Sequence, residues 1–88
     1  MTKIYHVILT RSAQKSLLKI YQSLSAIGRR ISRAIEQLKT NPHLGLKLKG
    51  TSEEVRRIRV GDYRIVYEVY EDTISILIVY IGPRGGAY

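Results

Sequence analysis

Cysteine is absent from this 88-residue sequence, and its only two histidines, His6 and His43, lie far apart. Without cysteine the chain can form no disulfide and offers no thiolate nucleophile. Two distant histidines argue against a zinc site or another imidazole site. No apolar run approaches the ~20 residues that span a bilayer, and Met1 to Ile8 lacks the apolar core of a secretion signal. We therefore expect a cytoplasmic protein without metal, cofactor or membrane partner.

Acidic residues are also scarce, because seven Asp and Glu oppose fifteen Lys and Arg and give a formal charge of +8. Such a charge favours encounter with polyanions such as nucleic acid, ribosomes or acidic protein segments. Charge alone fits a merely soluble basic surface equally well. A chain of 88 residues is near the lower size at which one core holds a fold, so we expect residues 1–88 to form a single domain.

Hydrophobic periodicity predicts the order strand, helix, helix, strand, strand, strand. The predicted elements are a strand within residues 3–9, a helix capped by Thr10 or Ser12 that stops near residues 25–28, a second helix ended by Asn41-Pro42, and strands at residues 55–60, 63–70 and 73–81. Residues 43–54 read as an ordered loop or a short irregular edge segment. The fold class is therefore α+β, with the two helices forming a hairpin.

The pair Gly61-Asp62 stands between two runs of alternating polarity and predicts a tight type II′ hairpin turn. Glycine accepts the positive φ that the first turn position requires. This turn pairs Val60 with Tyr63 and thereby sets the register of the two strands.

In that register Arg59 lies opposite Arg64, and Arg57 shares their face because side chains alternate with period two. Like charges directly across a sheet are destabilising. We therefore expect an anion, in particular a phosphate, to bind there. The same face also carries Glu68, Ser75, Val66, Leu77 and Val79.

The opposite face is predicted to be apolar and to pack on the helix hairpin. Its register continues through a second turn at Glu71-Asp72, with Tyr70 opposite Thr73. The predicted apolar face consists of Ile58, Val60, Tyr63, Ile65, Tyr67, Val69, Ile74, Ile76, Ile78 and Tyr80.

Four segments in this order resemble the RelE/ParE superfamily of toxin–antitoxin toxins, and within it the RelE branch. They are Leu38-Lys39-Thr40-Asn41-Pro42, Leu48-Lys49-Gly50, the hairpin from Arg57 to Tyr67, and Gly82-Pro83-Arg84-Gly85-Gly86-Ala87-Tyr88. The terminal motif looks most like archaeal members. The resemblance implies a RelE-like fold with a mainly antiparallel twisted sheet packed on the helix hairpin.

The resemblance further implies a ribosome-dependent endoribonuclease that cuts messenger RNA in the decoding site and arrests translation. In the family the RNA's own 2′-hydroxyl attacks, leaving a 2′,3′-cyclic phosphate, and no metal takes part. A cognate antitoxin protein would silence the toxin, and DNA binding would arise only through the antitoxin complex.

Three residues match the family's catalytic positions. Arg64 matches the central phosphate-binding arginine, and its fork of donors suits two phosphate oxygens. Arg84 matches the terminal arginine, which would clamp the phosphate or assist the leaving group. Tyr88 matches the terminal tyrosine, which stacks on a base or orients the attacking hydroxyl.

The proton acceptor is left open, because Arg57 and Arg59 stand where well-studied relatives carry lysines. Arginine is effectively never neutral, so both residues would bind RNA phosphate electrostatically. The remaining candidates for the base are Tyr88, Glu68, Lys49 and Lys47, the two lysines also being candidate phosphate contacts. Glu68 also fits as an ion-pair partner of the arginines.

Other functions compete with the nuclease. A ParE-type toxin would poison DNA gyrase with the same fold and no ribonuclease site. A degenerate partner in a DNA-binding repressor, or a basic RNA-binding protein, would also need no catalysis. His6 and His43 are expected to be ordinary surface residues, Leu77 and Val79 either antitoxin contacts or covered by the chain's own terminus, and Arg29, Arg30 and Arg33 a solvated face or a ribosome-binding patch.

Overall fold

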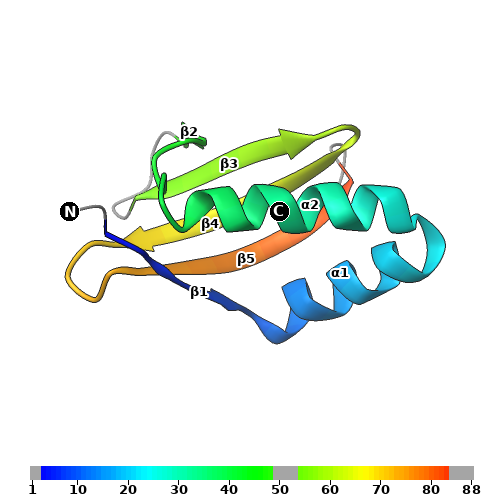
Figure 1. The fold of residues 1–88 in the computed structure, drawn as a ribbon, viewed down its shortest axis with the longest axis horizontal. Helices are drawn as coiled ribbons and strands as arrows, with labels where there is room; N and C mark the ends of the chain where they lie inside the picture. The colour runs from blue at the N-terminus through cyan, green and yellow to red at the C-terminus, as the bar shows by residue number, and fades with distance from the viewer. Residues whose placement is uncertain (1–2, 49–53, 84–88) are drawn as a thin grey trace.

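The helices and the sheet form two layers, with both helices on one face of the sheet (Figure 1). This computed structural model describes residues 3–48 and 54–83. Its elements are β1 (His6–Leu9), α1 (Arg11–Ser23), α2 (Ser25–Leu38), β2 (Leu46–Lys47), β3 (Val55–Val60), β4 (Tyr63–Tyr70) and β5 (Ser75–Pro83). The five strands within these described residues are ordered β1-β5-β4-β3-β2, and among them only β1 and β5 pair in parallel. The predicted α+β fold is confirmed, and the short β2 is the predicted edge segment.

The helix hairpin is tighter than its sequence suggested. Thr10 caps α1 as predicted, because its hydroxyl accepts a hydrogen bond from the amide of Ala13 at 3.1 Å. The break was placed too late, since only Leu24 separates the two helices. Gly28 therefore lies inside α2, where a Cβ would come within 2.9 Å of the Tyr21 ring, so its small size permits close helix packing. Neither described helix is long and apolar enough to cross a membrane.

The β3–β4 hairpin has the predicted register, with Val60 paired to Tyr63. Gly61 has a φ of 60°, whereas Asp62 is not among the described residues with positive φ. This combination is that of a type II′ turn, because only its first central residue needs a positive φ. The prediction for this hairpin is confirmed.

The β4–β5 connection is longer than predicted. Tyr70 pairs with Ser75, and not with Thr73, so the turn contains two more residues than expected. Ile74 closes this turn with a φ of 50°, an uncommon conformation for a β-branched residue. A shift of two residues preserves the facing of each side chain, because the strand repeat is also two.

A β-bulge then reverses the facing at the end of β5. The register shifts between Val66 and Tyr67, which pair with Tyr80 and Ile78 respectively, so Val79 is an extra residue on β5. From this point Tyr80 lies on the face away from the helices, and Ile81 joins the core. The predicted place of Tyr80 on the helix face is therefore wrong.

The core lies between the helices and the sheet. Fully buried side chains from both layers fill it, among them Ile31, Leu38, Ile65, Tyr67, Ile76, Ile78 and Ile81. Tyr67 also fixes the loop after α2, because its hydroxyl donates to the Pro42 carbonyl at 2.8 Å and accepts from the Gly45 amide at 2.9 Å. Burial raises the pKa of the Tyr67 phenol above its ordinary value.

Candidate nucleic-acid interface

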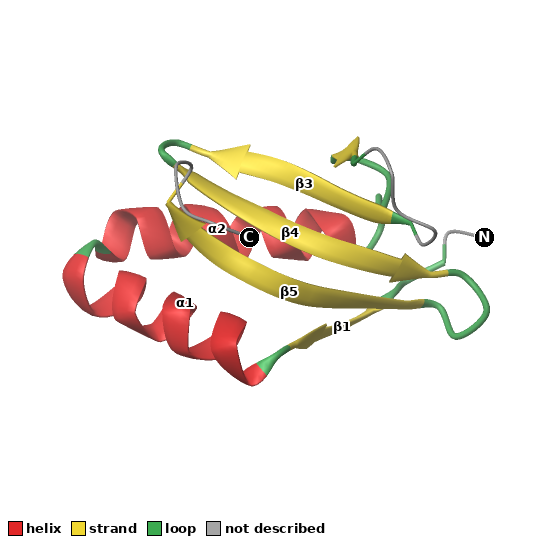
Figure 2. Ribbon diagram, turned by 180° about the vertical axis from the view of Figure 1, so that it is seen from behind, coloured by secondary structure: helices red, strands yellow, loops and turns green. Residues whose placement is uncertain are grey.

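The helices leave one face of the sheet uncovered (Figure 2), and the strand register places three arginines on it. Arg59 pairs directly with Arg64 across β3 and β4, and Arg57 lies one row away, opposite Val66. Arg59 is exposed, while Arg57 and Arg64 are half-buried. We name this side of β3, β4 and β5 the arginine face. The structure therefore brings together the three arginines that the turn predicted.

Arg59 and Arg64 are like charges directly opposed across β3 and β4. Directly opposed residues in a sheet have Cβ atoms only ~4.5–5.5 Å apart, and like charges at that distance repel. A bound phosphate would offset this repulsion, because each guanidinium can donate two parallel hydrogen bonds to its oxygens. Arg59 and Arg64 thus have the chemistry and spacing of an anion site.

Tyr80 is a candidate site residue that the sequence pattern did not reveal. It lies in the same row as Val66 and Arg57, on the arginine face. A Cβ on Gly82, the residue paired with Arg64, would collide with the Tyr80 hydroxyl, so the phenol lies over Gly82. Only the bulge puts the ring there, and no turn residue or motif marks that bulge in the sequence.

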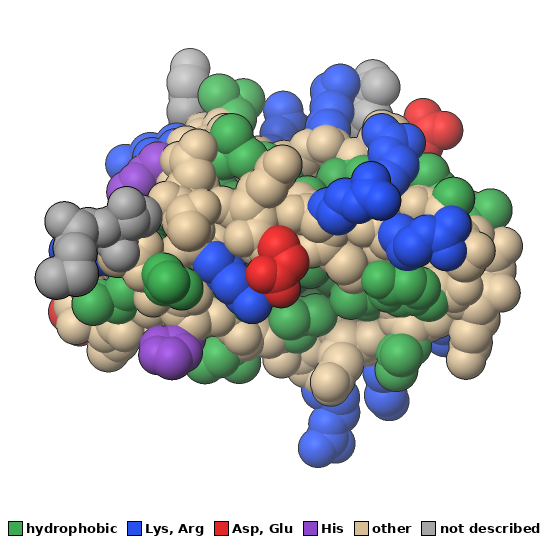
Figure 3. All heavy atoms as spheres, in the orientation of Figure 1, with side chains coloured by type: hydrophobic (Ala, Val, Ile, Leu, Met, Phe, Trp, Pro, Cys, Tyr) green, Lys and Arg blue, Asp and Glu red, His purple; other side chains and the backbone are tan. Residues whose placement is uncertain are grey.

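A basic hollow adjoins the arginine face across the edge of β3. It has a volume of about 270 Å³ and is lined by residues of α2 and β3: Arg30, Arg33, Ala34, Gln37, Arg59 and Val60. Figure 3 shows Lys and Arg side chains gathered over this part of α2, near the β3–β4 turn. Arg59 belongs to both surfaces, so positive charge continues from one to the other.

Lys47 and Glu68 are less closely associated with the arginines. Lys47 pairs with Arg56, whose side chain alternates with that of Arg57, so Lys47 lies on the opposite face of the sheet. Glu68 shares the arginine face, but it is four residues, or ~13 Å of strand, beyond Arg64. Its carboxylate accepts a hydrogen bond from the Tyr70 hydroxyl at 2.6 Å.

Three predicted site residues lie outside the described part of the chain. They are Lys49, Arg84 and Tyr88. Their proposed roles therefore remain predictions from the sequence.

Metal-ligating side chains meet elsewhere, at the far end of the sheet. His43, expected to be an ordinary surface residue, lies beside Glu54 and Glu71. No sequence motif predicts this cluster, because its members come from three separate segments. Residues far apart in the chain are brought together only by the strand register.

Comparison with known proteins gives a consistent result. Residues 7–88 match the family model described as the ParE toxin of the type II toxin–antitoxin system parDE. Toxin RelE of Mycobacterium tuberculosis is 31% identical over 85 residues, covering 96% of this chain and 86% of that protein. Putative toxin RelE1 of Methanocaldococcus jannaschii is 39% identical over 64 residues, covering 68% of this chain and 71% of that protein.

Solved structures agree with the sequence relatives. The archaeal RelE–RelB complex from Pyrococcus horikoshii OT3 contains a chain with a TM-score of 0.78 and 34% identity. The alignment covers 99% of this chain and 100% of that one. The similarity therefore extends over the helix pair and the sheet alike.

Proposed function

This chain belongs to the RelE/ParE superfamily and is a RelE-like toxin of a type II toxin–antitoxin system, and on that premise we propose that it is a messenger RNA endonuclease. It enters the decoding site of the ribosome in the cytoplasm, cuts the message there and so inhibits translation. The observation that carries the proposal is the pairing of Arg59 with Arg64, beside Arg57, on the sheet face opposite the two described helices.

The proposed reaction is an in-line attack by the RNA 2′-hydroxyl on the adjacent phosphorus. The 2′-oxygen forms its bond to phosphorus as the bond to the 5′-oxygen breaks, leaving a 2′,3′-cyclic phosphate and a free 5′-hydroxyl. Negative charge grows on the phosphate oxygens in the transition state. Arg64 stabilises that charge, and Arg57 and Arg59 add to the positive potential.

Proton transfer completes the reaction, since the 2′-hydroxyl loses a proton and the leaving oxygen gains one. Arg84 assists the leaving group in this proposal, and Tyr88 orients the attacking hydroxyl or stacks on a base. Tyr80 is a further candidate for that orienting role, because its hydroxyl lies over Gly82 beside Arg64. Glu68 is a weaker candidate for the base, because its carboxylate is bonded to Tyr70.

The macromolecular partners follow from the same surfaces. The chain in the P. horikoshii structure was solved with RelB, which supports a cognate antitoxin as partner here. The basic hollow of Arg30, Arg33 and Arg59 suits the phosphates of ribosomal RNA or of the message leaving the arginine face. Charge would then serve both catalysis and docking.

A cleavage assay with programmed ribosomes tests the proposal. Purified protein is added to ribosomes holding a defined message, and the cut positions and new 3′ ends are mapped. We expect cuts in the decoding site with 2′,3′-cyclic phosphate ends, both with and without excess chelator on preformed complexes. An uncut message, or cuts that depend on added divalent ions, would contradict the proposal.

The alternative is a ParE-type toxin that poisons DNA gyrase, and the matching family model, described as a ParE toxin, is the observation that favours it. The same protein preparation can be tested for inhibition of gyrase supercoiling. Inhibited gyrase together with an intact message would select this alternative over the nuclease.

A further inference from the structure

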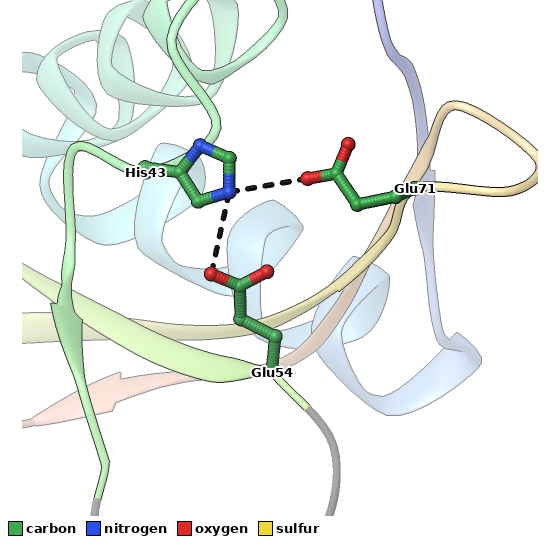
Figure 4. Close-up of side chains that lie close together, drawn as sticks. All are labelled: His43, Glu54 and Glu71. Carbon is green, nitrogen blue, oxygen red and sulfur yellow. Dashed lines mark ion pairs between the residues drawn. The ribbon is translucent and has the colours of Figure 1, made fainter.

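Three metal-ligating side chains converge at the end of the sheet opposite the β3–β4 turn (Figure 4). His43 Nε2 lies 3.3 Å from Glu54 Oε1 and 3.1 Å from Glu71 Oε1. His43 comes from the loop after α2, Glu54 directly precedes β3, and Glu71 directly follows β4. Ligand atoms of all three lie within 4.8 Å of one another. Three chain segments thus direct an imidazole and two carboxylates at one small volume.

We propose that His43, Glu54 and Glu71 form a Zn²⁺ site. Zinc holds imidazole nitrogen and carboxylate oxygen at about 2.0–2.2 Å in tetrahedral geometry, which places neighbouring ligand atoms ~3.3 Å apart. The two separations from His43 Nε2, 3.1 and 3.3 Å, correspond to that spacing. An imidazole among the ligands favours zinc over magnesium or calcium, which prefer oxygen ligands throughout.

The local charge also favours a cation. In a chain of net charge +8, two of the seven acidic residues face the same imidazole nitrogen. Arg56 bonds Glu54 Oε1 through Nε at 3.0 Å and Nη2 at 2.6 Å. Arg56 and His43 Nε2 both approach Oε1 of Glu54, so Zn²⁺ would share that oxygen with Arg56 or bind Oε2, the second oxygen of the carboxylate.

Outer hydrogen bonds hold the ligands in place. The Tyr5 hydroxyl donates to Glu71 Oε2 at 2.5 Å, on the side away from His43. Arg56 Nη1 donates to the Gly45 carbonyl at 2.7 Å, which ties the strand to the loop that carries His43. Such partners orient metal ligands and contribute to metal affinity. The three candidate ligands are therefore held by hydrogen bonds from neighbouring residues.

The site is open and separate from the arginine face. The side chains of His43 and Glu71 are 47% and 49% exposed, which leaves an entry path and room for water as a fourth ligand. Tyr70, the neighbour of Glu71, lies six positions along β4 from Arg64, which amounts to ~20 Å of strand. The zinc would join the loop after α2, the start of β3 and the β4–β5 turn, and would take no part in RNA cleavage.

Calorimetric titration with ZnCl₂ near neutral pH tests the site. The full-length chain is used without a polyhistidine tag, after chelator treatment and dialysis. We expect one Zn²⁺ per chain, and a melting temperature that zinc raises and Mg²⁺ leaves unchanged. His43→Gln should abolish binding, Tyr5→Phe should weaken it by about tenfold through the outer shell, and His6→Gln, at the other histidine, should leave it intact.

Absence of saturable binding would overturn the proposal, and so would equal binding by wild type and His43→Gln. Should His43→Gln fail to give a wild-type circular dichroism spectrum, Glu71→Gln replaces it. Loss of zinc binding in that folded variant supports the site, and unchanged affinity refutes it.

Discussion

Arginine side chains have different surroundings at the two ends of the β3–β4 strand pair. At the end near Glu54, Arg56 bonds a carboxylate and two loop carbonyls, so its positive charge is compensated and holds the loop. At the hairpin end, Arg59 is paired with Arg64, and Arg30 and Arg33 line the hollow beside them. One end thus uses arginine to stabilise the fold, whereas the other places two arginines opposite each other, where we propose that a phosphate binds.

Alanine substitutions at two glycines, one at each end, should show the difference between the two ends most strongly. A Cβ on Gly45 would lie 2.6 Å from the Tyr67 hydroxyl and 2.7 Å from the Arg57 carbonyl. Because backbone and buried groups must move, we expect Gly45→Ala to lower the free energy of unfolding by about 3 kcal/mol. Urea unfolding measures this loss of stability.

Gly82→Ala is the matched substitution at the other end. There the new Cβ meets the far end of the Tyr80 side chain, which can rotate away. We expect Gly82→Ala to destabilise less than Gly45→Ala and to reduce message cleavage. Equal destabilisation by the two variants would contradict the difference between the ends.

Tyr67→Phe should cause the next largest loss of stability. Loss of the hydroxyl leaves the Gly45 amide and the Pro42 carbonyl without a buried partner, at a cost of about 2 kcal/mol. Tyr63→Phe is the control, because the described residues give the Tyr63 hydroxyl no hydrogen bond. Chemical unfolding of both variants measures the difference, and equal stability would refute the anchoring role.

Glu54 should make the compensated end sensitive to acid. Arg56 holds the folded-state pKa of Glu54 below its ordinary 4.5, so its stabilisation is present above that pH and is lost as pH falls through the folded-state value. We expect Glu54→Gln to cost about 1 kcal/mol at pH 6 and less at the lowest pH at which the protein remains folded. Urea unfolding at both pH values measures this.

Glu36→Gln is the control for that acid dependence, because Glu36 pairs with Lys39 on the exposed side of α2. It should change stability little at either pH. A Glu54→Gln effect that persists undiminished in acid would contradict the ion pair as its cause.

Arg59→Gln should have the smallest effect on stability and the opposite sign. Removing one of two opposed arginines relieves repulsion and should raise the free energy of unfolding by about 0.5 kcal/mol. The gain should shrink in high salt, which screens the repulsion. Arg29→Gln, an exposed arginine on α2, controls for net charge, and a gain of the same size there would remove the argument for local repulsion.

The hairpin end could be predicted from local sequence, because Gly61-Asp62 permits one tight turn and that turn determines which residues pair. The face on which each strand side chain lies, up to the bulge, then follows from the two-residue repeat of a strand. The juxtaposition of Arg57, Arg59 and Arg64 was therefore accessible from the sequence, although their roles in RNA binding remain predictions.

The far end of β5 could not be predicted in the same way. A single extra residue, Val79, reverses the facing of everything after it, and Val, Ile and Tyr fit either face of a sheet equally well. Tyr80 was misplaced for that reason. The break between the two helices was misplaced for a related reason. In sequence, a glycine that permits close helix packing, such as Gly28, cannot be distinguished from a glycine that ends a helix.

The cluster of His43, Glu54 and Glu71 lay beyond sequence reasoning for another reason. Its members are separated by long stretches of chain and meet only because β3 and β4 run side by side and the loop after α2 packs on them. Histidine spacing alone therefore gave the wrong impression that His43 was isolated.

The most direct test measures cleavage and stability together in Arg64→Ala. If the hairpin end serves phosphate binding, loss of this guanidinium should lower the rate of message cleavage in programmed ribosomes by about 10²–10³-fold. The variant should stay folded, because Arg64 is half-buried on the sheet surface and is not part of the hydrophobic core. Cleavage at the wild-type rate, or a loss of activity that only follows a loss of folded protein, would contradict the account.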